Sequence, residues 1–457
     1  MMYPKLYPSL YPSNDHDGER YGLIRLWESV STSLIVGDTV YKGTAFEVPE
    51  LHRVIHTVEI TGLEPDTEYS FNLPNGEITA LYTTLKDDPR TSVVVHWQTK
   101  TPFINRPATY QDTGYKFRTF PNSLNDRSVT MISGGDIFQH GQIAKLRSAF
   151  DVITNRKPDV FVIAGDIAYA DNVWDNRGQW HTFWDEWLQR IDPNEPIIPM
   201  VVGIGNHEIG NGVEITHQRG ERFNFEEKRL GNNTWFAAQF AFPQNGAYGV
   251  IDAGDYLSLV MLDSEHASPY NTQYAVQTVW LGNTLNARKN VKHVIPFTHI
   301  PSFPATRSYS STVSGRMRDN WIPLYEAHGG VKVVFEHHDH VYKRTVPIKT
   351  VDGEPAEHPD GIRFLGDGAM GVVIRDAWNP NTTWYLEDVK ATRYVQAESG
   401  VSDPMDGQPG YDTTVDEAWH VYETVFESDK RTINTLNILG DGNGTVYHTL
   451  VQEVDHV

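Results

Sequence analysis

The sequence predicts an α/β protein that begins with an all-β region. Up to about residue 122, short alternating segments are separated by turns rich in Pro, Gly and Asn, which is typical of antiparallel strands. From about residue 127, apolar runs alternate with segments of helical spacing, which is typical of a parallel sheet with crossover helices. Residue types that bind metals directly follow several of these apolar runs. We therefore expect an all-β domain over residues 21–124 and an α/β domain over residues 125–457.

The all-β region carries the pattern of a sandwich. Polar and apolar residues alternate at 57–61, and residues 115–121 have the composition of a last strand. The segment Leu63–Tyr69 resembles a tyrosine corner, in which the Tyr hydroxyl bonds back to the backbone of the preceding turn. We therefore expect Tyr69 to close a turn between two strands.

The α/β region contains both strand and helix patterns. Runs of β-branched apolar residues, typical of buried parallel strands, occur at 160–164, 197–204, 291–297 and 331–335. Helical spacing is found for Ile143, Leu146, Phe150 and Ile153, and again for Val276, Val279 and Trp280. A third helix carries an aromatic stripe of Trp180, Phe183, Trp184 and Trp187, which we interpret as core packing. Closing antiparallel strands are expected after about residue 415.

The composition limits the possible functions. The 457 residues carry a formal charge of −21 and no Lys/Arg-rich run, so we expect no nucleic-acid binding. No stretch approaches the ~18 apolar residues of a membrane span, and no apolar signal core is evident, so we expect a soluble protein. Cysteine is absent, so metal ligands must be N or O donors. Tyr-Pro pairs recur in residues 1–20 and predict an extended arm. The oligomeric state and the compartment stay open.

Five short segments carry residue types that bind metals. They are residues 135–136, 165–169, 205–208, 298–299 and 337–340. Sites in open α/β proteins form beyond the carboxyl ends of the strands, so we expect these segments to meet at one edge of one sheet. The sequence therefore predicts a site for two metal ions.

The donors in these segments suit metal chemistry. Gly before Asp136 and Asp166 lets the backbone turn sharply, so that a short carboxylate reaches a metal or bridges two. Tyr169 supplies a phenol oxygen, a hard donor that favours Fe(III), and Asn206 supplies an amide oxygen. Imidazoles come from His207, His299, His338 and His340.

On these segments the chain resembles the calcineurin-like metallophosphoesterases, and specifically their purple acid phosphatase branch. The Asp-x-x-Tyr element at Asp166 and Tyr169 separates that branch from relatives with His at the corresponding place. The resemblance covers roughly residues 45–450 and includes residues 261–265, 273–281 and 365–368. It implies a four-layer metallophosphoesterase-type β-sandwich flanked by helices, preceded by a fibronectin-like domain.

The resemblance also implies a role for each site residue. The Fe(III) ligands would be Asp136, Tyr169 and His340, and the ligands of a divalent ion (Zn, Fe or Mn) would be Asn206, His299 and His338. Asp166 would bridge the two ions, and His207 would contact the phosphate.

The chain departs from the family pattern at several positions. The first segment lacks the usual Gly two residues after Asp136, and Pro296 takes the place of Val in the fourth. In the fifth segment His337 replaces Gly, which makes His337 a rival ligand. Plant-type members have a phosphate-binding His several residues after the fourth segment, where this chain reads Arg307-Ser308-Tyr309. We expect Arg307 to take over this contact with the substrate.

These patterns predict a dinuclear metal-dependent hydrolase of small phosphate monoesters, with a metal-bound hydroxide as nucleophile. Charge on the phosphate oxygens would be stabilised by the ions and His207. Two alternatives stay open. A phosphodiesterase would use the same ions but prefer a bis-ester. A binding or structural protein would keep a relict site, although a decayed site should lack at least one ligand.

Overall fold

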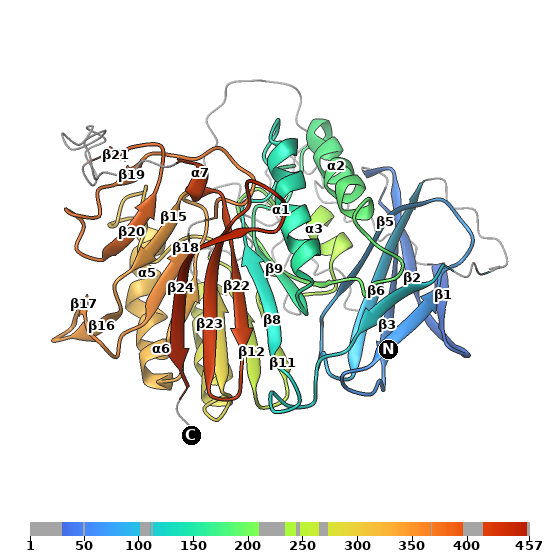
Figure 1. The fold of residues 1–457 in the computed structure, drawn as a ribbon, viewed down its shortest axis with the longest axis horizontal. Coiled ribbons are helices and arrows are strands. Elements are labelled where there is room, and N and C mark those ends of the chain that lie inside the picture. Colours follow the sequence, from blue (N-terminus) through green and yellow to red (C-terminus); the bar gives the residue numbers. More distant parts are fainter. Residues whose placement is uncertain are drawn as a thin grey trace, which may run out of the picture.

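The computed structural model describes residues 30–48, 51–100, 110, 113–209, 234–243, 247–264, 273–366, 368–395 and 415–454. Figure 1 shows the N-terminal strands beside a larger body of sheets and helices. The predicted class is confirmed, since an all-β region precedes a sheet-rich α/β region. The predicted arm at residues 1–20 lies outside the described residues.

The described part of the N-terminal region contains seven strands. They are β1 (Val30–Val36), β2 (Thr39–Val48), β3 (Arg53–Thr61), β4 (Glu68–Asn72), β5 (Ile78–Thr84), β6 (Ser92–Lys100) and β7 (Tyr115–Arg118). They lie in the order β5-β6-β3-β2-β1-β4-β7, and each neighbouring pair is antiparallel. One hydrophobic cluster joins side chains of β1, β3, β4, β6 and β7, including Leu34, Val58, Phe71, Val95 and Phe117. The sheet therefore folds over itself, as expected of a fibronectin-like domain.

The tyrosine corner is confirmed. The hydroxyl of Tyr69 accepts a hydrogen bond from the backbone N–H of Glu64 at 2.8 Å. This bond closes the turn that leads into β4.

The first large sheet continues from this region into the α/β part. It adds β8 (Val129–Gly134), β9 (Val160–Ala164), β10 (Pro199–Gly203), β22 (His420–Phe426), β23 (Lys430–Asn437) and β24 (Thr445–Glu453). The order on this side is β24-β23-β22-β8-β9-β10, and β10 pairs in parallel with β5 through Pro199↔Thr83 and Met200↔Thr84. A continuous sheet therefore crosses the predicted domain boundary at residues 124–125, and this boundary stays a prediction.

A second sheet of seven strands faces the first. Its order is β11 (Gly249–Ala253), β12 (Leu257–Met261), β13 (His293–Phe297), β14 (Val333–Phe335), β18 (Arg363–Gly366), β15 (Tyr342–Thr345) and β20 (Leu386–Lys390). The ligand segments thus come from two sheets, and the expectation of a single sheet was wrong. Apolar runs mark buried strands but carry no information about which strands pair.

The alternation of side chains along the strands builds four layers. One face of β8–β10 packs on α1 (Ile143–Arg156) and α2 (Arg177–Leu188), with Ile132, Phe161 and Val202 in the contact. The opposite face meets the second sheet, with Met131, Val162, Leu259 and Phe297 between the sheets. The outer face of the second sheet packs on α4 (Gln273–Asn286), α5 (Thr312–Asn320) and α6 (Ile322–His328). Each fully buried large side chain contributes roughly 1.5–3 kcal/mol.

Two predicted helix faces have different outcomes. The stripe of Trp180, Phe183, Trp184 and Trp187 on α2 is buried in the core, as predicted. On α4 the helix is confirmed, but Val276 and Val279 are 53% and 65% exposed. Its buried face carries Gln277 instead, which donates to the carbonyl of Asp263 at 2.8 Å and accepts from its N–H at 2.9 Å. A satisfied polar residue takes the inward position, which hydrophobic spacing alone does not reveal.

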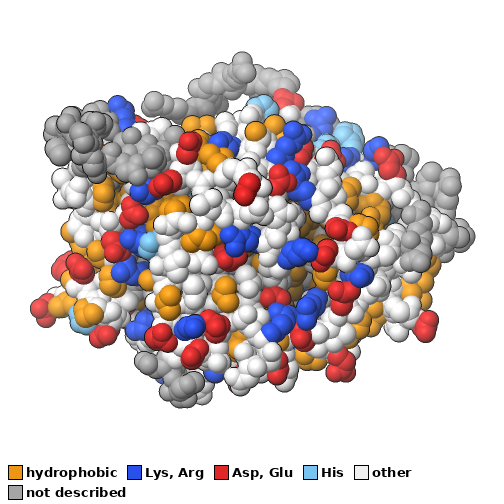
Figure 2. All heavy atoms as spheres, viewed as in Figure 1, with side chains coloured by type: hydrophobic (Ala, Val, Ile, Leu, Met, Phe, Trp, Pro, Cys, Tyr) orange, Lys and Arg blue, Asp and Glu red, His pale blue; other side chains and the backbone are white. Residues whose placement is uncertain are grey.

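Smaller elements complete the described part. They are a short 3₁₀ helix (Trp174–Asn176), α3 (Thr234–Gln239), α7 (Val415–Ala418), β16 (Ile348–Val351), β17 (Glu354–Glu357), β19 (Ala377–Trp378) and β21 (Tyr394–Val395). On the face seen in Figure 2, acidic and basic side chains of the described residues are interspersed. No helix among the described residues is long and apolar enough to cross a membrane.

Candidate metal centre

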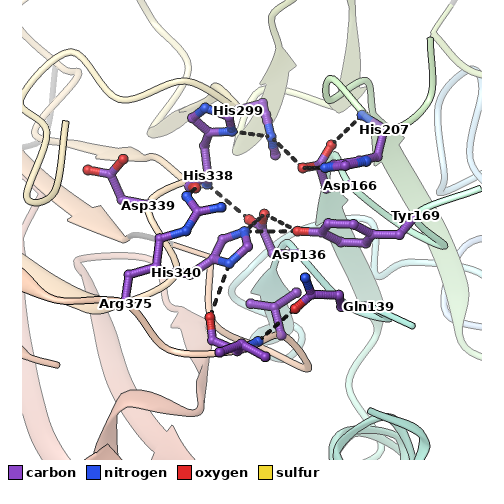
Figure 3. A network of polar contacts seen from close by, with 12 residues as sticks. Asp136, Gln139, Asp166, Tyr169, His207, His299, His338, Asp339, His340 and Arg375 are labelled. Carbon is purple, nitrogen blue, oxygen red and sulfur yellow. Dashed lines mark hydrogen bonds and ion pairs between the residues drawn. The ribbon is translucent and has the colours of Figure 1, made fainter. Parts of the chain in front are cut away.

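The predicted donors all lie just beyond the carboxyl ends of strands. Asp136 follows β8, Asp166 and Tyr169 follow β9, Asn206 and His207 follow β10, His299 follows β13, and His338 and His340 follow β14. β8, β9 and β10 are parallel neighbours in one sheet, and β13 and β14 are parallel neighbours in the other. Because the two sheets pack face to face, their strand ends converge, and the site side chains meet there (Figure 3).

A first group of donors contains Asp136, Tyr169 and His340. The Tyr169 hydroxyl lies 2.8 Å from Asp136 Oδ1 and 2.9 Å from His340 Nε2, and this Nε2 lies 3.0 Å from the same Oδ1. His340 Nδ1 donates to the carbonyl of Val373 at 3.2 Å, which directs Nε2 into the group. Burial, together with the charges of Asp136 and Asp166, raises the pKa of Tyr169 well above its ordinary value. Three donors, two of them oxygens, thus face one point.

A second group contains Asp166, His299 and His338, whose donor atoms all lie within 4.8 Å of one another. His299 Nε2 lies 3.2 Å from His338 Nδ1 and 3.1 Å from Asp166 Oδ2. His299 Nδ1 donates to the carbonyl of Ala164 at 3.0 Å, a bond that crosses from one sheet to the other and turns Nε2 toward the group. Imidazole is the commonest metal ligand in proteins, so these two rings and the carboxylate of Asp166 form a candidate metal-binding group.

Two buried oxygens beside these groups fit a metal ion. Among the described residues, Asp166 Oδ2 and Asn206 Oδ1 are buried without a hydrogen-bond partner. The 3.1 Å contact of Asp166 Oδ2 with His299 Nε2 is therefore an approach without hydrogen-bond geometry. A buried polar atom without a partner costs about 1–3 kcal/mol, and a bound cation would remove this cost. The N and O donors present thus fit the metal site that the sequence predicts.

The site loops are held in an unusual backbone conformation. Positive φ angles occur at Asp136 (53°), Asp166 (53°), Tyr169 (50°), His338 (80°) and His340 (59°). This left-handed region costs residues with a side chain about 1–2 kcal/mol each. Neighbouring contacts must therefore stabilise these loops, and such strain is concentrated at functional sites.

Close approach of the loops requires two glycines. A Cβ atom on Gly165, which has φ of +94°, would lie 2.7 Å from His299 Nδ1. A Cβ atom on Gly205 would lie 2.3 Å from Asp166 Oδ1. The Gly before Asp166 thus permits the sharp turn that the sequence predicts, and it also permits the contact between the two sheets.

Asp171, a carboxylate that was not predicted from the sequence, positions His207. Its Nδ1 lies 2.5 Å from Asp171 Oδ1, its backbone N–H donates to Asp166 Oδ1 at 2.8 Å, and its side chain is 29% exposed. Burial alone would lower the pKa of His207, but Asp166 and Asp171 outweigh burial and raise it to about 9. Asp171 follows Asp166 by five residues. This short spacing was the sequence signal that could have indicated its role.

Asp166 is held between two histidines. Burial would raise the pKa of Asp166, but the positive charges of His299 and His207 hold it well below its usual range. Burial would likewise lower the pKa of His299, but Asp166 and Asp136 raise it to about 9. These opposing charges keep Asp166 ionised.

Glu208 fastens two ligand segments together. Its carboxylate accepts from the backbone N–H groups of Asp166 and Ile167 at 2.7 Å each and of Gly205 at 2.8 Å. Its side chain is buried, and burial together with the charge of Asp166 raises the pKa of Glu208 to about 7. Glu208 therefore fixes the geometry of ligand segments without itself facing the donors.

His337, the rival ligand, packs against Gly135, and both of its buried ring nitrogens lack a hydrogen-bond partner within the described part of the chain. A Cβ atom on Gly135 would lie 2.8 Å from His337 Cγ, so the ring occupies the space that this Gly leaves. Burial lowers the pKa of His337 well below its ordinary value, which keeps the ring neutral. Among the described residues, the metal-compatible group around Asp166 does not include His337. The fifth segment has His337 where the family has Gly, and the small residue at position 135 leaves room for this larger side chain.

Arg307 is anchored beside the site rather than within the donor groups. Its Nε donates to Asp339 Oδ1 at 3.1 Å, and its side chain is 41% exposed. Asp339 is fully buried, and its other oxygen accepts from the N–H groups of Ala305 and Thr306 at 2.7 and 2.9 Å. Its carboxylate points away from Asp136 in Figure 3.

A second arginine, Arg375, was not singled out by sequence. Its Nη1 donates to the carbonyl of His338 at 3.0 Å, and its backbone N–H donates to the carbonyl of His340 at 3.2 Å. Figure 3 shows its guanidinium beside His338 and His340. No motif marks this position, because it lies in the loop between β18 and β19, far along the chain from the ligand segments.

Comparison with known proteins identifies related chains. The sequence pattern of the family described as "Calcineurin-like phosphoesterase" matches residues 134–342. Purple acid phosphatase 18 of Arabidopsis thaliana is 24% identical over 264 residues, which are 56% of this chain and 53% of that protein. The human serine/threonine-protein phosphatase CPPED1 is 29% identical over 53% of this chain and 75% of that protein. The match thus spans about half the length of the plant relative.

A solved structure shares the fold. The purple acid phosphatase PPD1 from yellow lupin (Lupinus luteus) seeds has a TM-score of 0.54 and 13% sequence identity, with coverage of 93% of this chain and 75% of that chain. The matched residues 134–342 include every predicted ligand. Residues 134–342 thus match a calcineurin-like phosphoesterase domain, and the relatives found by sequence support the purple acid phosphatase branch of that family.

Proposed function

We propose that this protein is a dinuclear metal-dependent hydrolase of phosphate monoesters. The observation that carries this proposal is the pair of donor groups, one of Asp136, Tyr169 and His340 and one of Asp166, His299 and His338. The first group would hold Fe(III) and the second, with Asn206, a divalent ion (Zn, Fe or Mn). Asp166 would bridge the two ions.

When bound, two neighbouring cations lower the pKa of a water molecule and stabilise the charge that develops on a phosphoryl group. The chain's own residues add to this chemistry. Asp171 holds His207 by its Nδ1 and favours the protonated ring, while His207 Nε2 lies 3.9 Å from Asp166 Oδ2 at the partly exposed side of the site. His207 is therefore placed to contact a phosphate oxygen or to donate a proton to the leaving group.

Arg307 is proposed to contact the substrate at the outer side of the site. Its Nε is engaged by Asp339, which leaves the terminal nitrogens of a fixed guanidinium for an anionic ligand. The replacement of Arg307 by Ala should raise KM for phosphate monoesters more than it lowers kcat, because the lost contact stabilises mainly the bound ground state. The N-terminal β-sandwich would shape the approach to the site.

The proposal is tested by metal analysis and absorption spectroscopy of protein purified without chelator, together with assays on a monoester and a diester. We expect two metals per chain, one of them iron, a visible charge-transfer band and faster hydrolysis of p-nitrophenyl phosphate than of bis(p-nitrophenyl) phosphate. Preference for the diester would favour the phosphodiesterase. Absence of both metal and activity would favour a relict site.

A phosphoserine or phosphothreonine substrate is a second candidate. It is favoured by the 29% identity to the human protein named serine/threonine-protein phosphatase CPPED1, of which the match covers 75%. Such a substrate is also a phosphate monoester, so the same donor groups would serve it. Release of phosphate from phosphoserine and phosphothreonine peptides, compared with p-nitrophenyl phosphate, tests this candidate.

A further inference from the structure

We propose that Arg375 binds the substrate phosphate and sets a preference for monoesters over diesters. The inference rests on the proposed function and names a specificity residue for it. Arg375 lies outside the five ligand segments and outside residues 134–342, which match the family pattern.

The backbone and the side chain of Arg375 are both tied to the loop that carries two ligands. The N–H of Arg375 donates to the carbonyl of His340 at 3.2 Å, and Nη1 donates to the carbonyl of His338 at 3.0 Å. The carbonyl of Arg375 in turn accepts from the N–H of Thr392 at 3.1 Å. The guanidinium is therefore held beside His338 and His340, as Figure 3 shows, instead of extending into solvent.

Arg375 differs from nearby charged residues because it forms no ion pair with a carboxylate of the described residues. The next residue, Asp376, pairs with Arg393 at 2.8 Å, and Arg307 is held by Asp339. For Arg375, no carboxylate of the described residues lies within ion-pair distance. A half-buried cation without a paired anion, next to a predicted phosphate site, is available to an anionic ligand.

The chemistry of the two ester classes then gives the preference. A phosphate monoester carries close to two negative charges at neutral pH and has three terminal oxygens. A diester has one charge fewer and one terminal oxygen fewer. A guanidinium has five N–H donors and stays charged at any working pH, so one donor can hold His338 while others bind a terminal oxygen. Arg375 thus stabilises the ligand that has the additional oxygen and charge.

The test compares Arg375→Gln and Arg375→Lys with Arg393→Gln as the matched control. Gln keeps an N–H donor for the His338 carbonyl but loses the charge, and Lys keeps the charge. Arg393→Gln removes the same charge from the guanidinium that pairs with Asp376. The measurements are metal content, kcat/KM for p-nitrophenyl phosphate and for bis(p-nitrophenyl) phosphate, and the inhibition constant of inorganic phosphate.

For Arg375→Gln we expect kcat/KM on the monoester to fall by roughly 10- to 100-fold, the effect of losing one charged hydrogen-bond partner. The diester rate should change far less, inorganic phosphate should inhibit more weakly by a similar factor, and the metals should stay. Arg375→Lys should keep most of the monoester preference, and Arg393→Gln should behave as the unmodified protein.

Two results overturn the inference alone. One is unchanged phosphate inhibition in Arg375→Gln. The other is an equal loss on both esters together with loss of metal, which would mean that Arg375 only supports the ligand loop. An unmodified protein that holds both metals and hydrolyses neither ester would instead overturn the proposed function, and this inference with it.

Discussion

Replacement of Glu208 by Gln tests whether the ligand segments are held by a buried carboxylate. Glu208 Oε2 accepts from the N–H groups of Asp166 and Gly205, and Oε1 accepts from that of Ile167. The single oxygen of Gln can still accept the first two bonds. Its NH₂ group then faces the Ile167 N–H, and one buried donor is left without an acceptor. This loss predicts a decrease of about 1–3 kcal/mol in the free energy of unfolding.

Glu208→Ala removes the acceptor for all three N–H groups, so we expect a larger decrease, of about 3 kcal/mol or more. Urea unfolding followed by tryptophan fluorescence measures the loss, and metal content measures its effect on the site. Metal affinity should fall in both variants, because the ends of β9 and β10 are no longer fastened together.

The matched control is Glu423→Gln. Glu423 is also a buried carboxylate, but it lies in β22 and bonds the side chains of Arg156 and Asn434. This variant should lose stability and keep its metals. If Glu208→Gln unfolds at the same urea concentration as the unmodified protein and keeps full metal affinity, the proposed role of Glu208 is wrong.

Four further changes test individual site residues. Tyr169→Phe should abolish the visible charge-transfer band of the oxidised protein while circular dichroism shows an intact fold; a variant that stays coloured contradicts the Fe(III) ligand. Asp166→Asn should lose metal and nearly all activity, whereas His207→Ala should keep its metals and lose activity by roughly 10²–10³-fold. Burial would lower the pKa of His207, but the charges of Asp166 and Asp171 raise it, so activity that needs the protonated ring should decline at alkaline pH. Asp171→Asn removes one of these anions and should move the alkaline decline of kcat/KM to lower pH; an unmoved decline would refute the pairing.

Much of the fold was predictable because buried strands appear in the sequence as apolar runs. The apolar runs at 160–164 and 331–335 became β9 and β14, and the segments after them became the site. The tyrosine corner was also predictable, since Tyr69 stands at a fixed distance from the turn it closes. Local patterns of this kind report on residues that are neighbours in the chain.

No such local pattern marks the pairing of strands that are far apart in the sequence. The parallel contact of β5 with β10 joins the N-terminal region to the first sheet. It pairs Thr83 with Pro199 and Thr84 with Met200, and no motif marks it. The assignment of β13 to a second sheet was equally hidden, because a buried strand reads the same in either sheet. Arg375 was missed for the same reason, since only the folded chain brings it to His338.

Acidic residues within ligand segments show why sequence alone could not separate ligands from supports. Asp339 stands between His338 and His340, yet its carboxylate accepts from the N–H groups of Ala305 and Thr306. Glu336 behaves alike: one oxygen accepts from the N–H of Ser302 at 2.6 Å and the other from buried Lys343, also at 2.6 Å.

Together with Glu208, these buried carboxylates bind the N–H groups of loops that end next to metal donors. Such loops contain backbone N–H groups without strand partners, and burial of an unpaired N–H is costly. A carboxylate that accepts two or three of them offsets this cost and also restrains residues with positive φ, such as His338 and His340. The donors with positive φ therefore depend on the supporting acids, which hold their loops in place. A cluster of acids beside strand ends indicates a site, and only the direction of each carboxylate tells which of them faces the metal.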